Sequence, residues 1–158
     1  MAEPVVNCRF RIEVDVDEQG QTDLGAFTEC DGLAAAYEMK EFREGGQNAF
    51  LHHIPGPLKF DNIKLSRPLD GSSAAVASWF SRMRERVERT TARITALDPS
   101  GGEIASWTLV DVYPVRWSGP SLSATGSVVA KETLELTHNG FVAEVPALSG
   151  SVSVELTA

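Results

Sequence analysis

The 158-residue chain contains 42% hydrophobic and 23% charged residues, a composition typical of a globular domain rather than of a disordered chain. Its formal net charge of −8 at pH 7 argues against a nucleic-acid-binding surface, because neutralising phosphates requires clustered lysine and arginine. No apolar run approaches the roughly 18–20 residues of a membrane span, and residues 1–7 lack the zones of a signal peptide. We therefore expect synthesis in the cytoplasm and no membrane anchor.

The N-terminal segment predicts a strand and a hairpin. Residues 8–16 alternate apolar and charged side chains, with Ile12 and Val14 on the apolar side. This period of two predicts a strand with one packed face and one face in water, either at the exterior or along a water-filled channel. Turn residues at 17–21 and a second extended segment at 25–30 predict the returning strand.

The two cysteines, Cys8 and Cys30, do not form a CxxC pair. Redox and zinc-binding motifs place their cysteines closer together. We interpret both as small hydrophobic residues of the core.

A long polar excursion follows, and it is the most informative part of the sequence. The chain is expected to run extended from about residue 34 to 44, to form a projecting loop at about 45–57, and to become a strand again at 58–65. Connections in compact domains have about 4–6 residues, and longer ones are often functional. We expect this loop to dock onto another copy of the chain. The candidate contact residues are Arg43, Glu44, Gly45, Gly46, Asn48, His52, His53 and Pro55.

One α-helix is predicted at about 72–90. Its apolar side chains recur at helical spacing and form a single stripe: Val76, Trp79, Phe80, Met83 and Val87. Asp70, Ser72 or Ser73 can cap its first turn. The charges on the opposite side form the i,i+4 pairs Arg84–Glu88 and Glu85–Arg89. They indicate a solvated face, with a subunit contact as the alternative.

The remaining chain is expected to be β again, with strands at 92–97, 103–117 and 128–137. Pro114 predicts a bulge or an edge, because proline cannot donate to a strand ladder. Glu132 lies among the apolar positions of the last strand, where a buried or interfacial carboxylate needs a partner.

Catalytic and metal-binding patterns are missing from the sequence. It contains no GxSxG, GxxxxGK[ST], HExxH or EF-hand pattern. His52 and His53 are a poor chelating pair, because adjacent residues of an extended chain point to opposite sides. Glu38, Glu41 and Glu44 alternate with basic residues, which favours surface salt bridges over acid–base catalysis. We expect no enzyme activity, no catalytic residue, no bound metal and no cofactor.

Several short segments, taken in order, carry a resemblance to a known family. They are Phe10–Val14, Gly25–Leu33, Glu41–Asn48, Ile54–Gly56, Leu65–Leu69, Trp79, Trp107, Trp117–Pro120 and Glu132–Gly140. Together they resemble the tail tube proteins of contractile-tailed phages and related contractile injection systems, over about residues 8–142. The chain departs from the family at Pro68, where glycine is more usual, and at Asn139, where glutamate is frequent. Residues 143–158 form a C-terminal extension of a single domain, 1–158, and either add an edge strand or stay loose.

The resemblance implies a mainly β fold, with two packed antiparallel sheets or an open β-barrel and one flanking helix. It also implies hexameric rings, joined edge to edge and stacked into the inner tube of a contractile particle. Sheath, baseplate and terminator proteins are the implied partners, and DNA or effector cargo is the implied content of the channel. Two alternatives stay open at this point. One is a hexameric tube or effector carrier of a type VI-like secretion system, and the other is a monomeric β-barrel that binds a small ligand.

Overall fold

The computed structural model describes residues 8–16, 20–43, 45–46, 52–121, 123–126, 128–147 and 150–157. The chain is mainly β with one helix, as expected. In chain order the elements are β1 (Arg9–Val16), β2 (Gly20–Phe27), β3 (Glu29–Asp31), β4 (Ala35–Phe42), β5 (His52–Phe60), β6 (Ile63–Pro68), α1 (Ser73–Glu85), β7 (Thr90–Leu97), β8 (Glu103–Ser118), β9 (Lys131–Thr137), β10 (Gly140–Ala147) and β11 (Gly150–Thr157).

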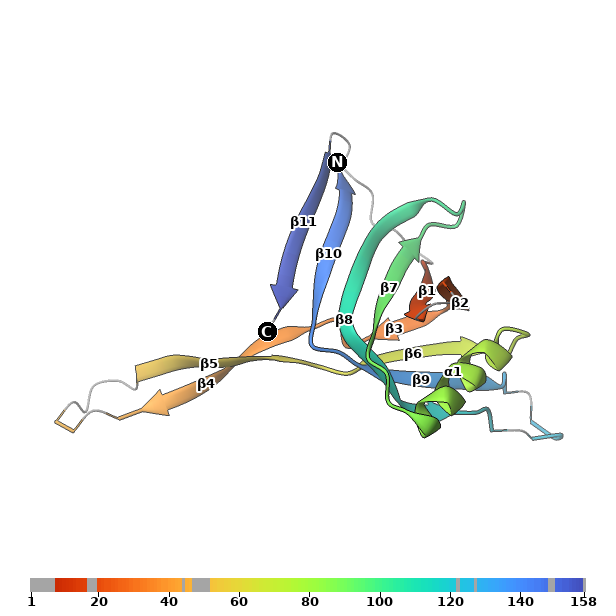
Figure 1. Ribbon diagram of the computed structural model, residues 1–158, viewed down its shortest axis with the longest axis horizontal. Helices are drawn as coiled ribbons and strands as arrows, with labels where there is room; N and C mark the ends of the chain where they lie inside the picture. The colour runs from red at the N-terminus through yellow and green to blue at the C-terminus, as the bar shows by residue number, and fades with distance from the viewer. Residues whose placement is uncertain are drawn as a thin grey trace.

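Nine of the strands form one antiparallel sheet that bends over itself at β8. The order is β2-β1-β7-β8-β9-β6-β3, and β10 joins β8 to β11. The 16-residue β8 pairs with β7 and β10 along its first part and with β9 along its last part. It thus links an upper layer (β2, β1, β7, first part of β8, β10, β11) to a lower layer (last part of β8, β9, β6, β3), as Figure 1 shows. The prediction of packed antiparallel layers is confirmed. The sheet stays open and does not close into a barrel.

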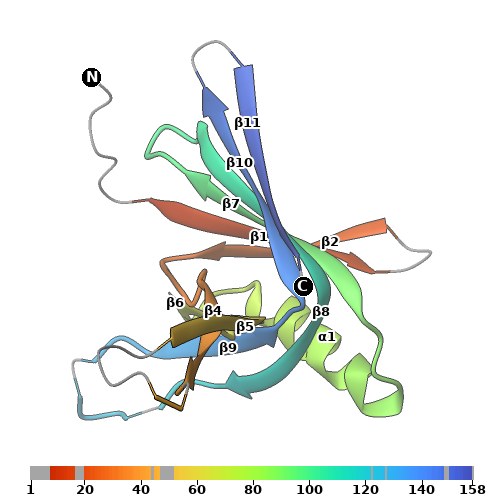
Figure 2. The same cartoon turned by 90° about the vertical axis from the view of Figure 1, so that its left-hand side faces the viewer.

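The core lies between the two layers and α1 (Figure 2). Ile12 and Val14 of β1 and Leu134 and Leu136 of β9 are fully buried. The alternation predicted for these two strands is therefore confirmed. Among the described residues, buried apolar side chains of both layers and of α1 belong to one core cluster.

The helix is shorter than the predicted range of 72–90. It ends at Glu85, because Arg86 already has an extended backbone with φ −153° and ψ 129°. The chain must become extended there to enter β7. Residues 86–89 therefore lie outside the helix, the two expected i,i+4 pairs are not helical pairs, and Val87 is 62% exposed.

The start of the helix also differs from the simplest capping scheme. The Asp70 carboxylate accepts a hydrogen bond from the Ser72 backbone N–H at 2.7 Å, whereas the Ser72 hydroxyl makes no capping bond. The Ser73 hydroxyl instead donates to Glu132. Of the three candidate side chains, only Asp70 bonds the backbone at this helix start.

The fold also tests the predictions for Pro114, for the C-terminal extension and for Cys30. The register of β8 on β9 shifts between Pro114 and Arg116, which confirms a bulge at the proline. Residues 140–147 and 150–157 form β10 and β11 and extend the sheet, so the edge-strand alternative holds for the described part of the C-terminal extension. Cys30 packs half-buried against the core, and burial, together with the nearby Asp31 carboxylate, raises the pKa of its thiol to about 12.

Candidate assembly interface

Strands β4 and β5 form a two-stranded antiparallel ribbon, here called the arm (residues 35–60), that projects away from the rest of the chain (Figure 1). The expected loop at 45–57 is thus too long, because residues 52–57 belong to β5. Pro55 and Pro57 were expected to lie in that loop. Proline is tolerated in a strand that has an unpaired edge, and each strand of a two-stranded ribbon has one.

The arm carries large apolar side chains in water. Tyr37, Met39, Phe42 and Ile54 are 61%, 54%, 53% and 50% exposed. Contiguous exposed apolar surface on a soluble protein usually marks an interaction site. Of the described hydrophobic residues of the arm, only Ala35 and Phe60, at its base, pack against the core.

The course of the ribbon depends on a glycine. The register shifts between Tyr37 and Met39, and there the backbone carbonyl of Glu38 approaches Gly56 so closely that a Cβ at that position would collide with it. Close backbone approach of this kind is a common reason for glycine within a strand. One exposed ion pair, Glu38 to Lys59 at 3.1 Å, also links the two strands.

The structure places most of the predicted contact residues on the outer half of the arm. Arg43 is exposed directly after β4, and Gly45 and Gly46 lie in an exposed turn. Gly46 has a φ of +101°, which favours glycine. His52, His53 and Pro55 lie in β5, whereas Glu44 and Asn48 fall outside the described residues. Their contact with another copy stays a prediction.

Sequence reasoning missed the apolar side chains of the arm: Tyr37, Met39, Phe42 and Ile54. A strand with apolar side chains looks the same in sequence whether its apolar face packs on the core or stays exposed. No local signal in the sequence separates these two cases.

The arm is fixed to the rest of the chain through His138. Its Nε2 lies 3.1 Å from the Asp61 backbone oxygen, and its Nδ1 accepts from the Gly140 N–H at 3.2 Å. Its ring lies 5.4 Å from that of Phe60, the last residue of β5. Burial lowers the pKa of His138, although its contacts with two backbone carbonyl oxygens, that of Gly140 at 3.2 Å from Nδ1 and that of Asp61, oppose the shift. The neutral ring, with its proton on Nε2, suits both hydrogen bonds.

Glu132 has the partner that its apolar setting requires. It forms an ion pair with Arg67, and both side chains are 1% exposed. Ser73 Oγ and Trp117 Nε1 also donate to Glu132, at 2.9 and 3.3 Å. Arg67 donates to the Leu24 carbonyl at 2.6 Å. This buried network joins β6, β9, β8, β2 and α1.

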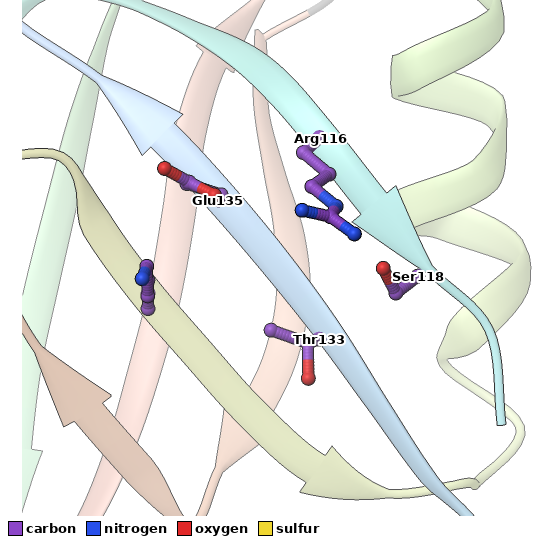
Figure 3. Close-up of a pocket in the computed structure, with 5 residues that line it drawn as sticks. Arg116, Ser118, Thr133 and Glu135 are labelled. Atoms are coloured by element: carbon purple, nitrogen blue, oxygen red, sulfur yellow. The ribbon is translucent and has the colours of Figure 1, made fainter.

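The outer face of the lower layer is polar, in contrast to its inner face. Strand register aligns Asp31 with Lys64, Lys64 with Glu135, and Glu135 with Arg116 across β3, β6, β9 and β8. The next row, in the same order, is Glu29, Ser66, Thr133 and Ser118. An open pocket of about 240 Å³ lies between these rows, and Figure 3 shows Arg116, Ser118, Thr133 and Glu135 around it. This face is hydrophilic and carries both signs of charge.

The described residues show neither a metal-binding cluster nor a membrane-spanning helix. In the described part of the chain, no three His, Cys, Asp or Glu side chains gather closely enough to hold a metal ion. None of the helical structure described there has the length and apolar character that crossing a membrane requires.

The family model of the T4-like virus tail tube protein gp19 matches residues 6–142. The chain belongs to this tail tube family. The match covers the arm, α1 and nearly the whole core, and it ends just after β10 begins. Its members are structural tube proteins rather than enzymes, and the chain is accordingly a subunit of the inner-tube type found in contractile injection systems.

Solved structures share the fold of this tail tube protein. A chain in the baseplate of the anti-feeding prophage (AFP) has a TM-score of 0.73 and 24% identity, with coverage of 90% of this chain and 97% of that one. A chain of the PVC sheath-tube complex, an extracellular contractile injection system, has a TM-score of 0.72 and 21% identity, with 90% and 93% coverage. A type VI secretion system effector from Yersinia pestis has a TM-score of 0.52 and 12% identity, with 94% and 99% coverage. No curated protein sequence matches the chain.

Proposed function

We propose that this tail tube protein assembles into hexameric rings, which stack into the inner tube of a contractile phage tail or injection particle. The arm is the observation that supports assembly most directly, because Tyr37, Met39, Phe42 and Ile54 are each at least half exposed. Burying apolar surface contributes about 25 cal/mol per Å². A neighbouring copy that covers these side chains therefore adds a hydrophobic stabilisation that the isolated chain does not have.

Open strand edges favour the same conclusion. Along the sheet order of the described strands, β2, β3 and β11 each pair with one neighbour only. Unpaired edges promote uncontrolled association unless they are covered. A head-to-tail contact that closes gives a ring, and one that does not close gives a filament. A stacked-ring tube uses both kinds of contact.

The expected partners follow from the relatives. Structures of relatives include a baseplate, a sheath-tube complex and a sheath/tube terminator. We propose that this tube likewise meets sheath, baseplate and terminator proteins, and that the subunit is made in the cytoplasm before it enters the particle. DNA or protein effectors would pass along the channel. The net charge of −8 per chain disfavours tight binding of acidic cargo, which helps it to slide.

Substitution at the arm tests this proposal. Arg43→Glu, or deletion of residues 46–54, should leave a folded monomer that does not polymerise. Circular dichroism measures folding, and sedimentation velocity with negative-stain electron microscopy measures assembly. The matched control is Arg82→Glu, a charge reversal on the exposed side of α1, which should leave tube formation intact. Long tubes formed by the deletion variant would contradict the role of the arm.

The type VI-like alternative, a ring that carries effectors, has partial support in the fold likeness to the Yersinia pestis effector, which is weaker than the likeness to the AFP and PVC chains. The two functions differ in the assembled state. Long filaments that copurify with a sheath protein support the tube of a phage tail or injection particle. Isolated rings released into the medium support the effector carrier.

A further inference from the structure

We propose that the open pocket on the polar face of the lower layer binds a phosphate group, with Lys64, Arg116 and Ser118 as its donors. The site lies within a single chain and does not depend on the proposed ring. The proposed assembly assigns no role to these side chains.

The strands bring two cations to this pocket from two sides. Register places Glu135 of β9 between Lys64 of β6 and Arg116 of β8. All three side chains line the pocket, whose volume is about 240 Å³. Lys64 and Arg116 are exposed, and Figure 3 shows Arg116 beside the open space. The two cations therefore meet solvent at one hollow of the surface.

Within the described part of the chain, neither Lys64 nor Arg116 forms an ion pair within 4.0 Å. The Glu135 carboxylate, which register places between them, accepts a hydrogen bond from the Asn62 side chain at 2.9 Å. The Asp31 carboxylate, on the other side of Lys64 in the register, accepts from the next backbone N–H at 2.8 Å. The pocket thus holds two positive charges and one negative charge, and its cations have donors to spare.

Hydroxyl groups add to the donor set. Ser118 and Thr133 line the same pocket (Figure 3). The Thr133 hydroxyl already lies 3.2 Å from that of Ser66. The Ser118 hydroxyl, in contrast, forms no hydrogen bond with any described residue. It is therefore the hydroxyl that can donate to a ligand without breaking an existing bond.

A tetrahedral oxyanion suits these donors better than a carboxylate. A guanidinium presents parallel N–H donors that match two oxygens of a phosphate, and an ammonium adds a compact charge. A hydroxyl can donate to a third oxygen, whereas a carboxylate has only two. The side chains that line the pocket are all polar, so the site recognises the phosphate group itself rather than an organic part attached to it.

The charge of the whole chain acts against a long polyanion. The net charge of −8 repels a nucleic-acid strand at a distance. The two cations of the pocket act only at short range, because salt screens exposed charges beyond about 8–10 Å. A single phosphate group should therefore bind in preference to a strand of linked phosphates.

Equilibrium dialysis with radiolabelled inorganic phosphate tests the site, and it applies to the chain in any state of assembly. We expect a dissociation constant of about 1 mM at low ionic strength. Lys64→Gln and Arg116→Gln should each weaken binding at least about fivefold, because each removes a charged donor. Circular dichroism measures the folding of each variant.

The matched control is Lys131→Gln. Lys131 belongs to the same layer, but its charge is already paired with Glu29 at 3.2 Å, so its loss should change phosphate binding by less than about twofold. Equal losses in Lys64→Gln, Arg116→Gln and Lys131→Gln would overturn the proposal. Absence of binding by the wild type up to about 10 mM phosphate would overturn it as well.

Replacing the acid that lines the pocket tests the site in the opposite direction, and it covers the case in which a cation variant does not fold. Glu135→Gln removes the negative charge beside the ligand and should tighten binding at least about fivefold. Glu103→Gln makes the same change of net charge at the other end of β8 and should change binding by less than about twofold. An equal gain in both variants would show attraction by the overall charge and would overturn the site.

Competition identifies the chemistry of the ligand. Sulfate, which is also tetrahedral, should displace phosphate more effectively than acetate. A short oligothymidylate should compete less well than free phosphate. Acetate that competes as well as sulfate would overturn the assignment of a tetrahedral oxyanion. An oligothymidylate that competes better would keep the phosphate group as the ligand and identify nucleic acid as its source. Wild-type protein that forms no tubes but binds phosphate would contradict the proposed function and leave this site intact.

Discussion

The arm and the lower layer are both antiparallel β-structure with apolar and charged side chains, yet they use their apolar side chains in opposite ways. Leu134 and Leu136 of the lower layer are fully buried, whereas Tyr37 and Met39 of the arm are more than half exposed. Apolar burial within the chain stabilises the folded monomer. Apolar surface left outside it can stabilise only an assembly.

The ion pairs of the lower layer and of the arm also differ in burial. Arg67 and Glu132 of the lower layer are 1% exposed, and further hydrogen bonds surround them. Glu38 and Lys59 of the arm, at 3.1 Å, have side chains 47% and 64% exposed. Removing one member of a buried pair leaves an uncompensated charge, whereas an exposed pair is worth little. Substitutions of the buried side chains of the lower layer should therefore destabilise the monomer, and substitutions of the exposed side chains of the arm should not.

The largest expected effect is that of Arg67→Met. It leaves the Glu132 carboxylate buried without its cation and should lower the free energy of unfolding by about 3–5 kcal/mol. Urea denaturation of the monomer measures this loss. Arg67→Met with Glu132→Leu removes both charges and should recover a large part of it. A loss below about 1 kcal/mol in the single variant would show that the pair behaves like a surface pair.

A matched pair of apolar truncations comes next. Leu134→Ala should lower the free energy of unfolding by about 2–5 kcal/mol, because it opens a cavity in the core. Met39→Ala on the arm should change it by less than about 0.5 kcal/mol but weaken assembly. Denaturation and sedimentation of the two variants give the comparison. A large stability loss in Met39→Ala would mean that the arm packs on its own chain.

A pH-dependent effect is expected at His138, where the arm joins the core. Since burial lowers the pKa of His138 in the folded chain, the unfolded chain binds the proton more readily. Stability should therefore fall as the pH drops below the ordinary histidine pKa of about 6.5, until the lower pKa of the folded state is reached. Denaturation at a series of pH values should show a shallower decline for His138→Gln than for the wild type. Equal slopes would mean that other groups carry the pH dependence.

The smallest effect is expected from Lys59→Ala, which breaks the exposed pair with Glu38. The free energy of unfolding should change by less than about 0.5 kcal/mol, because the partners stay hydrated. The same denaturation measurement applies. A loss comparable with that of Arg67→Met would remove the distinction between the two regions.

The sequence predicted those features that depend on a short local pattern. The alternation around Ile12 and Leu134 identified two core strands, and Pro114 predicted the bulge in β8. Glu132 among apolar positions indicated a buried partner, although the identity of that partner was missed. A corresponding signal existed, because Arg67 occupies the same kind of position after Ile63 and Leu65 in β6.

The features that the sequence did not predict depend on distant parts of the chain. The helix ends at Glu85 rather than near residue 90, because the chain must become extended to join β7 in the sheet. Residues 52–57 form a strand because β4 lies alongside them, and local proline content gave the opposite expectation. The apolar side chains of the arm were missed for a similar reason, since their exposure depends on the absence of a covering layer.

Electron microscopy of the purified wild-type chain, with sedimentation velocity on the same sample, tests the central claim most directly. We expect hexameric rings and stacked tubes at high protein concentration, with a central channel. A folded chain that remains monomeric at high concentration, without rings or tubes, would contradict it.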